Sequence, residues 1–370
     1  MSLAQSRPIS RRLLLLGVVL FMLSAACGDG DSATTTEPAA AGGAATTAAV
    51  AEACDLTVLF PVNSPILHGF RVADEAGYLA DEGVNAAYEF FGGGGEAITQ
   101  LIAGNGDAAI VPVGNVVEAI EEGNTDLRSL WNYTYGSIFY IATPTDSGIA
   151  TAEDLDGKKV GISDLAGGEV PIVRGIIASA GLTEADVELI PVGEGTALAV
   201  NAVETGQVDA VGGSINDIIA LEVQGLELNY IIPGPLLELP AVGFVMKEEV
   251  LNEKSDCVQG FLRAVTKGYY WAQVNPENTL ALLKKVTPEQ FTDDTGARIF
   301  DAVITLTWVK DWPNVPMGFQ SGDTWGAFFD FIGAERPDVP LGDIVIDDYI
   351  PGANDWDPAD VKADADAYTP

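Results

Sequence analysis

Short apolar runs of strand length alternate with amphipathic segments of helical length from residue 55 to about residue 247. The runs that predict strands are residues 56–62, 84–90, 107–113, 127–135, 137–144, 158–163, 187–192, 208–214, 228–234 and 241–247. The segments that predict helices between them are residues 65–83, 92–106, 114–124, 167–182, 195–207 and 215–224. This alternation predicts an α/β protein with mostly parallel sheets and helices on both sheet faces.

The strands fall into two series, and the strand pattern returns once more before a mostly helical remainder. We therefore expect a lobe 1 made of residues 54–140 and 241–350 and a lobe 2 made of residues 141–240. The two hinge crossings between the lobes are expected near residues 136–146 and 236–243. Ligands of open parallel sheets bind outside the carboxyl ends of the strands. Two such lobes would enclose one cleft.

The C-terminal third is predicted to be helical, with one helix broken at Asn275-Pro276 and a second helix after the break. Residues 351–370 are rich in Asp and contain Pro, and they are expected to form a loose acidic tail. The acids of this tail lack the ligand order of an EF-hand loop, so a solvated tail is favoured over a calcium site.

The first 26 residues have the pattern of an export signal. Arg7, Arg11 and Arg12 precede the apolar segment 13–23, which is too short to span a bilayer comfortably. The stretch LSAAC that follows resembles the lipobox of bacterial lipoproteins, which implies lipidation of Cys27 and anchoring to the cell membrane. A plain secreted protein with a chance cysteine is the alternative, and the arginine pair leaves both Sec and twin-arginine export open.

Residues 27–53 consist mainly of Gly, Ala, Ser and Thr with scattered acids, and they lack aromatic residues and periodicity. Such a composition predicts a flexible tether between a lipid anchor and a folded body.

The chain is strongly acidic, with 54 Asp and Glu against 18 Lys and Arg and a formal net charge of −36. This charge repels nucleic acid and anionic lipid headgroups, so neither is expected as a partner. Two cysteines besides Cys27 remain, Cys54 and Cys257. Outside the cytoplasm we expect them to form a disulfide, and two buried thiols are the alternative.

Three stretches of the chain resemble a known family: FRVADEAGYLADEGVNAAYEFFGGGGEAITQLIAGNGDAAIV (70–111), TAEDLDGKKVGIS (151–163) and ASAGLTEADVELIPVGEGTALAVNAVETGQVDAV (178–211). The family is that of the solute-binding proteins for nitrate, sulfonates, taurine and thiamine precursors. The resemblance implies a type II periplasmic-binding fold, and together with the export signal we expect an extracytoplasmic, monomeric protein. It also implies delivery of a small organic or oxyanion solute to the permease of an ABC transporter.

The loops at the predicted carboxyl ends of the strands contain the candidate ligand-binding residues, namely Asn63, His68, Phe91, Gly93, Gly94, Asn115, Tyr133, Tyr135, Ser137, Gly168, Glu169, Glu194, Ser214, Asn216 and Asp217. The glycines of FFGGGGE precede a predicted helix, whose free N–H groups favour an oxyanion. The same glycines are also typical of a turn that needs close backbone approach. The acids favour a cationic or hydrogen-bond-donating ligand instead, such as an aminopyrimidine. The sequence leaves both ligand classes open.

An enzyme is disfavoured because the chain has a single histidine, cysteines expected to be oxidised, and no metal-ligand spacing. Relatives that make the thiamine pyrimidine carry a CCCFC-type motif, which this sequence lacks. We therefore expect no catalysis, cofactor or metal, with a thiamine-pyrimidine-synthase-like enzyme as an alternative. A second alternative is a tethered sensor that presents its ligand to a membrane receptor.

Overall fold

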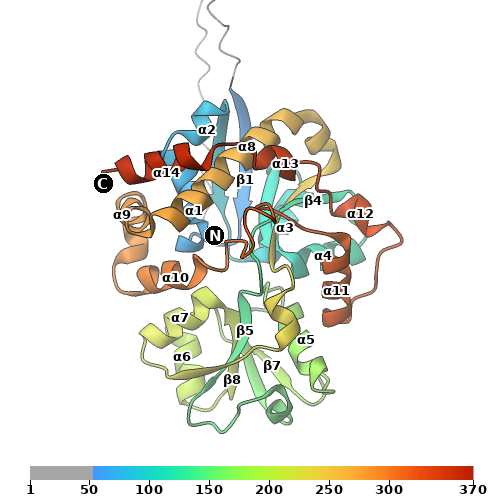
Figure 1. The fold of residues 1–370 in the computed structure, drawn as a ribbon. Coiled ribbons are helices and arrows are strands. Elements are labelled where there is room, and N and C mark those ends of the chain that lie inside the picture. Colours follow the sequence, from blue (N-terminus) through green and yellow to red (C-terminus); the bar gives the residue numbers. More distant parts are fainter. Residues whose placement is uncertain (1–52, 370) are drawn as a thin grey trace, which may run out of the picture. The chain divides into compact units, whose positions relative to one another are not determined.

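The computed structural model describes residues 53–369, shown as a ribbon in Figure 1. The predicted signal peptide, the predicted lipidation site Cys27 and all but the last residue of the predicted tether lie outside the described residues. None of the helices within residues 53–369 is long and apolar enough to cross a membrane.

Residues 53–369 contain ten strands in two five-stranded sheets, which confirms every predicted strand with ends shifted by at most three residues (Figure 1). The first sheet has the order β2-β1-β3-β10-β4 and consists of β1 (Cys54–Phe60), β2 (Val84–Phe90), β3 (Ala108–Pro112), β4 (Leu127–Asn132) and β10 (Val242–Lys247). The second sheet has the order β7-β6-β8-β5-β9 and consists of β5 (Phe139–Pro144), β6 (Lys159–Ile162), β7 (Glu188–Pro191), β8 (Ala210–Ser214) and β9 (Leu228–Ile231).

Each sheet contains one strand that runs against the other four. β10 is antiparallel to both β3 and β4, and β5 is antiparallel to both β8 and β9. These two strands are the first to follow each passage of the chain from one sheet to the other. The chain leaves one sheet at the edge where its parallel strands end, and it enters the other sheet at the corresponding edge. The first strand after each passage therefore runs antiparallel to the other strands of its sheet. The expected mostly parallel α/β fold is confirmed, with mixed sheets as the refinement.

The helices cover both faces of the sheets. Their bounds are α1 His68–Glu75, α2 Tyr78–Asp81, α3 Gly94–Ile102, α4 Val113–Glu121, α5 Val170–Ser179, α6 Ala197–Glu204, α7 Ile215–Val223, α8 Glu248–Val274, α9 Pro276–Val286, α10 Thr295–Val303, α11 Gly322–Ile332, α12 Leu341–Ile344, α13 Ile350–Ala353 and α14 Pro358–Ala367. Short 3-10 turns are η1 Pro65–Leu67, η2 Ala152–Leu155, η3 Gly234–Leu237 and η4 Pro288–Phe291. The helix predicted over 65–83 is divided, because Gly77 has a φ of +83° that only glycine adopts easily.

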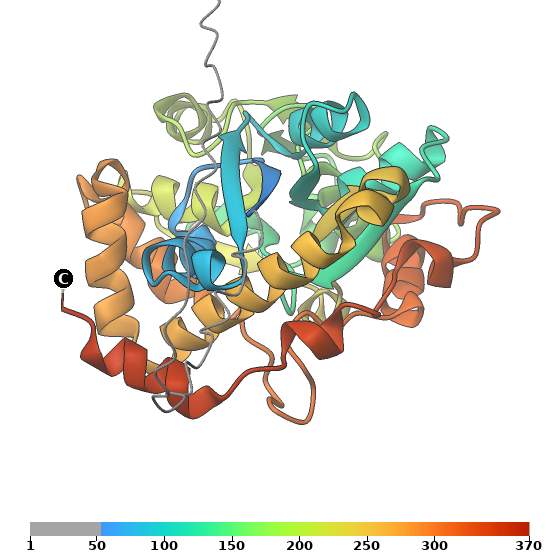
Figure 2. The same ribbon diagram turned by 90° about the horizontal axis from the view of Figure 1, so that it is seen from above.

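The predicted break at Asn275-Pro276 is confirmed. Pro276 begins α9, and the Asn275 side chain caps it by accepting a hydrogen bond from the Asn278 N–H at 3.1 Å. α8 packs against α1, α2 and the first sheet, as the view in Figure 2 shows. α11 lies farther along the chain and packs against α5, beside the second sheet.

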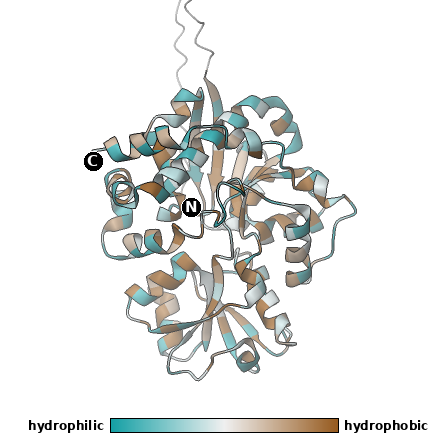
Figure 3. Cartoon of the chain, viewed as in Figure 1, coloured by the Kyte–Doolittle hydropathy of each residue, from teal (hydrophilic) through white to brown (hydrophobic). Residues whose placement is uncertain are grey.

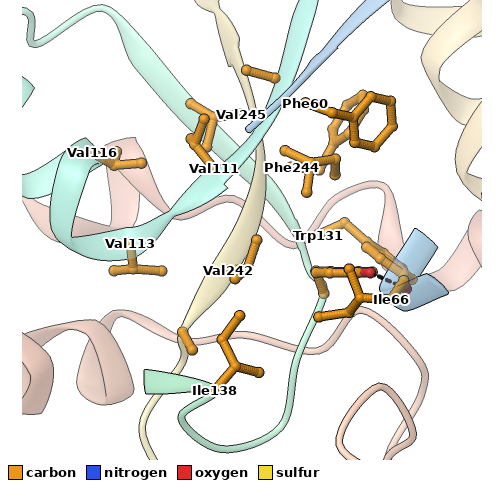
Figure 4. Packing of buried hydrophobic residues seen from close by; sticks show 14 of the residues in the cluster. Phe60, Ile66, Val111, Val113, Val116, Trp131, Ile138, Val242, Phe244 and Val245 are labelled. Carbon is orange, nitrogen blue, oxygen red and sulfur yellow. Dashed lines mark hydrogen bonds between the residues drawn. The ribbon is translucent and has the colours of Figure 1, made fainter. Parts of the chain in front are cut away.

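The hydrophobic core continues through the first sheet. Phe60, Val111, Trp131 and Phe244 are fully buried there, and Figure 4 shows their side chains packed around the strands. The hydropathy colouring in Figure 3 places hydrophobic residues on the strands and hydrophilic residues on the outer helices. Because the strands are held by this buried core, their ends are fixed in place, and so are the starts of the loops that follow them.

The predicted disulfide between Cys54 and Cys257 is present, with the two Cα atoms 6.0 Å apart. It joins the start of β1 to α8 across a sequence separation of 203 residues.

The loose acidic tail predicted for residues 351–370 is wrong for the part that the structure describes. α13 and α14 lie along α8 (Figures 1 and 2), and Val361 and Ala365 are buried. The Tyr78 hydroxyl donates a hydrogen bond of 3.0 Å to the Asp364 carboxylate. The buried apolar side chains of α14 are two small ones, four residues apart, and this pattern is too weak to be recognised in the sequence among so many acids.

Candidate ligand-binding site

A cavity of about 70 Å³ lies between the carboxyl ends of the strands of the two sheets. Its lining comes from both sheets and consists of Pro61, Val62, Ile66, Leu67, Gly93, Gly94, Ile110, Pro112, Tyr133, Ile138, Phe139, Gly168, Glu169, Glu194, Ser214, Asn216, Asp217 and Val242. This place agrees with the rule that open α/β sheets bind ligands at the strand carboxyl ends. The lining contains three carboxylates and no Lys, Arg or His.

One side of the cavity is apolar and is continuous with the packed core. Ile66, Ile138 and Val242 line it, and Figure 4 shows all three near the start of β10. Tyr133 contributes an aromatic ring, and its hydroxyl donates a hydrogen bond to the Ile66 carbonyl oxygen. Burial raises the pKa of Tyr133 well above its ordinary value, so this phenol remains a neutral donor. Phe139 adds a second ring at the start of β5.

Glu169 and Asp217 are carboxylates at the starts of two helices: Glu169 is the N-cap residue of α5, and Asp217 lies in the first turn of α7. Glu169 is only 4% exposed and accepts hydrogen bonds from the Ser163 N–H at 2.8 Å and the Ser163 hydroxyl at 2.6 Å. Asp217 accepts from the Ser214 N–H at 2.9 Å and the Ser214 hydroxyl at 2.6 Å, in a capping box at the start of α7. Burial raises the pKa of both carboxyls despite these hydrogen bonds.

Glu194 is the third carboxylate and stands on the loop between β7 and α6. Part of the residue is exposed to solvent and part lines the cavity, and its side chain accepts no hydrogen bond from the residues that the structure describes. The pKa of Glu194 is raised to about 8. The largest cause is the loss of surrounding water, and the negative charges of Asp217, Glu169 and Asp164 contribute in the same direction. The three carboxylates that share this cavity therefore favour one another's protonated forms.

The glycine turns serve close packing. A Cβ on Gly168 would lie 2.4 Å from the Pro112 Cγ, and a Cβ on Gly95 would lie 2.8 Å from the Ala166 carbonyl oxygen. Pro112 ends β3 in the first sheet, whereas Ala166 and Gly168 follow β6 in the second. Glycine is therefore required where the loops of the two sheets approach each other.

Two side-chain hydrogen bonds join these loops across the cavity. The Ser64 hydroxyl donates to Asn216 Oδ1 at 2.9 Å. The Asn115 amide group donates to the Ala166 carbonyl oxygen at 3.3 Å and to Glu118, and its own Oδ1 is buried without a partner. The loops and helix starts at the strand ends of the two sheets are therefore in direct contact around the cavity.

Nine of the fifteen residues proposed from the sequence line this cavity, namely Gly93, Gly94, Tyr133, Gly168, Glu169, Glu194, Ser214, Asn216 and Asp217. The other six are not in its lining: Asn63, His68, Phe91, Asn115, Tyr135 and Ser137. Asn115 stands directly behind Gly94, since its Oδ1 lies 2.2 Å from the position of a Cβ on that glycine. Ser137 lies at the passage between the sheets and hydrogen-bonds the backbone of Phe139.

His68 and Tyr135 pack against other parts of the chain instead. His68 is fully buried between the rings of Tyr269 and Phe300, and its Nδ1 lies 3.2 Å from the Pro65 carbonyl oxygen. Tyr135 accepts a hydrogen bond from the Gly318 N–H. Asn63 is exposed, and Phe91 is half-buried at the end of β2. A position near a strand end therefore does not by itself bring a side chain to the cavity.

Sequence reasoning missed the apolar half of the lining, namely Pro61, Val62, Ile66, Leu67, Ile110, Pro112, Ile138, Phe139 and Val242. For all of them except Ile110, which lies in the middle of β3, the available signal was their place near strand ends or at the two passages between the sheets. They were overlooked because an apolar residue at such a position has the same pattern as a core residue.

Residues 64–279 match the family model described as NMT1/THI5 like, which is more than half of the chain. The chain belongs to the NMT1/THI5-like family. The family expected from the sequence resemblance is thereby confirmed, and the two sheets have the fold of periplasmic binding proteins.

Two curated proteins and one solved structure illustrate the relationship. The chain is 23% identical over 214 residues to the riboflavin-binding protein RibY of Chloroflexus aurantiacus, covering 56% of this chain and 60% of that protein. It is also 23% identical over 267 residues to the formylaminopyrimidine-binding protein of Halalkalibacterium halodurans, covering 71% of this chain and 79% of the relative. The alkanesulfonate-binding protein SsuA of Xanthomonas axonopodis pv. citri superposes with a TM-score of 0.63 at 18% identity, over 80% of this chain and 99% of that one.

Proposed function

We propose that this protein is the extracytoplasmic solute-binding component of an ABC importer. The observation that carries the proposal is the cavity enclosed between the strand ends of the two sheets, with lining residues from both. The family and the binding proteins to which the chain is similar support the same function. The solute is a small organic compound or an oxyanion that the permease then receives.

The proposed cycle begins with separation of the two lobes, residues 54–140 with 241–350 and residues 141–240. Opening would break the Ser64–Asn216 hydrogen bond, and closure around a solute would restore it. A cavity of about 70 Å³ is smaller than the roughly 300 to 1,000 Å³ of sites for drug-sized ligands. In this conformation the site suits a compact solute, and a larger one requires the lobes to stand farther apart.

The site is proposed to bind without catalysis. Its polar side chains are carboxylates, Ser214, Asn216 and Tyr133, and the lining offers neither a thiol nor an imidazole. Within residues 53–369, no group of three His, Cys, Asp or Glu side chains is arranged to hold a metal ion.

The proposal includes a lipid anchor on Cys27 and a flexible tether. A tether keeps the binding body near its permease, which raises the effective concentration of the pair without any new contact. The permease and the membrane anchor are then the only membrane partners, and the body works as a monomer.

The decisive experiment begins with the full chain, purified from its own organism without refolding. Denaturation releases bound small molecules, which mass spectrometry identifies. Deletion of the chain should abolish import of the released solute and leave the import of unrelated solutes intact. Unchanged import of that solute in the deletion strain would refute the proposal.

A further inference from the structure

The polar side chains of the cavity are mostly hydrogen-bond acceptors. Glu169, Glu194 and Asp217 present carboxylate oxygens, and the two serines nearest to them already donate their hydroxyl protons to these acids. A bound solute therefore meets an excess of acceptors and of negative charge. An inference about its chemistry rests on the proposed function, because it concerns the solute of the same site.

A second, independent observation is an acceptor without a donor. Asn115 is 2% exposed, and both protons of its amide group are directed to other acceptors, the Ala166 carbonyl oxygen and Glu118. These two bonds fix the amide orientation, so the buried Oδ1 is the atom left unpaired. It lies 3.3 Å from the position of a Cβ on Gly168, and Gly168 and Gly94 line the cavity beside it. Buried acceptors of this kind usually have a partner, and a donor that reaches between Gly94 and Gly168 would supply one.

The helix N-terminus that favours an oxyanion already faces carboxylates of the chain itself. Glu96 accepts the Gly92 N–H at 3.0 Å in the turn that opens α3. The Glu194 Oε1 lies 3.7 Å from the position of a Cβ on Gly93, the N-cap residue of α3. A carboxylate so placed takes the position where a nitrate or sulfonate would profit from the helix dipole.

The remaining wall is apolar and aromatic, which distinguishes an organic ion from a metal ion. Tyr133 and Phe139 present rings, and the faces of such rings attract organic cations. Ile66, Ile138 and Val242 add hydrocarbon surface that a hydrated metal ion would not use.

The geometry points to a small organic cation as the solute of this site, one that carries its charge on N–H groups, such as a protonated amine or an amidinium. Its N–H groups donate to Glu169 and Asp217, and its hydrocarbon part lies against the rings. Glu194 closes the acidic side of the cavity.

Cation binding is then linked to a proton. The groups that face Glu194 are Asp217 from α7, Glu169 from the start of α5 and Asp164 from the loop after β6, and the titratable lining residue of the first sheet is Tyr133. Because the pKa of Glu194 is raised to about 8, its carboxyl is mostly protonated at pH 7. An arriving cation displaces that proton. Its affinity should rise by up to tenfold per pH unit from pH 6 to pH 8 and level off above pH 8.

The test uses three probes of nearly the same shape and different charge: benzamidinium, benzamide and benzoate. Binding to the full chain is measured by calorimetry at pH 8.5, with nitrate and a short alkanesulfonate as additional anions. We expect benzamidinium to bind at least about tenfold tighter than benzamide, equivalent to 1.4 kcal/mol, and benzoate to bind weakest. Tightest binding by benzamide or by any of the anions, or no binding by any probe, would overturn the inference.

The variant Glu194→Gln removes one charge and leaves the size of the side chain unchanged. It should weaken benzamidinium about tenfold at pH 8.5 and flatten the pH profile of its affinity. The matched control is Glu204→Gln, which alters the net charge equally at the exposed end of α6 and outside the cavity. Equal behaviour of the two variants would overturn the role of Glu194.

The outcomes for function and for ligand class remain distinguishable. An imported, co-purified solute without positive charge overturns the cation and leaves the solute-binding function standing. Import that does not depend on the chain overturns the proposed function, whatever the order of the three probes.

Discussion

Removal of the Cys54–Cys257 disulfide is predicted to cost about 5 kcal/mol of stability. The bond closes a loop with a sequence separation of 203 residues, for which the chain-entropy model gives a loss of about 18 cal/mol/K in the unfolded state. At 25 °C this corresponds to roughly 5 kcal/mol of unfolding free energy.

The native contacts at both ends of the disulfide indicate that nearly the whole predicted loss of unfolding free energy should be observed. The Cys54 N–H donates to the Gly83 carbonyl oxygen at 2.9 Å, which holds the start of β1 in the sheet. Lys254 at the start of α8 donates to the Asp55 carbonyl oxygen at 2.9 Å and pairs with Asp107 at 2.8 Å. The folded state keeps these contacts without the disulfide, so the change falls mainly on the unfolded chain.

The assay is urea unfolding followed by fluorescence of the six tryptophans. Three samples are compared: the oxidised chain, the reduced chain, and the double variant Cys54→Ser with Cys257→Ser. The reduced chain and the double variant should lose about 5 kcal/mol, or about 7 °C in Tm for a body of this size. Reduced and double-variant chains within about 1 kcal/mol of the oxidised chain would refute the reasoning.

Two further predictions concern the cavity and the single histidine. Gly168→Ala places a methyl 2.4 Å from the Pro112 Cγ, so the contact between the loops of the two sheets must widen. Overpacking of this kind costs about 1 to 3 kcal/mol, so affinity for the co-purified solute should fall about 5- to 150-fold with little change in Tm. Unchanged affinity would contradict the contact. Burial lowers the pKa of His68 to about 4, below its unfolded value of 6.5. The unfolded state therefore binds the proton more readily, so stability is full above pH 6.5 and falls by roughly 3 kcal/mol as the pH drops to 4. The only imidazole in the NMR spectrum should titrate near pH 4, and titration near 6.5 would disprove its burial.

The sequence was sufficient for the strands because their signal is local. Each apolar run needs only its own residues and the turn residues beside it to indicate a strand, and all ten runs become strands. Cys54 and Cys257 likewise needed only their number and their expected compartment.

The direction of β5 and β10 came from the tertiary structure. The hydrophobic pattern of a strand is the same in a parallel and an antiparallel ladder, so the sequence indicates a strand without its orientation. The passages between the two sheets decide it, since they bring the chain back at the carboxyl-end edge.

The site shows the same division between local and long-range information. The strand-end rule placed Glu169, Glu194 and Asp217 together, because the carboxyl ends of parallel strands meet at one edge. It also suggested His68, which follows β1 as closely but turns into the core between two aromatic rings. Which way a side chain points after a strand depends on the elements that pack against it.

By itself, then, the amino-acid sequence determined the strands, the family resemblance, the disulfide and the acidic strand ends. The tertiary structure alone decided that the glycine turns are packing contacts, that Asn115 has an unpaired oxygen, and that α14 is a packed helix. The physical reason is that periodicity and composition act between neighbours in the chain. Burial, close approach and the pairing of charges depend on residues that only folding brings together.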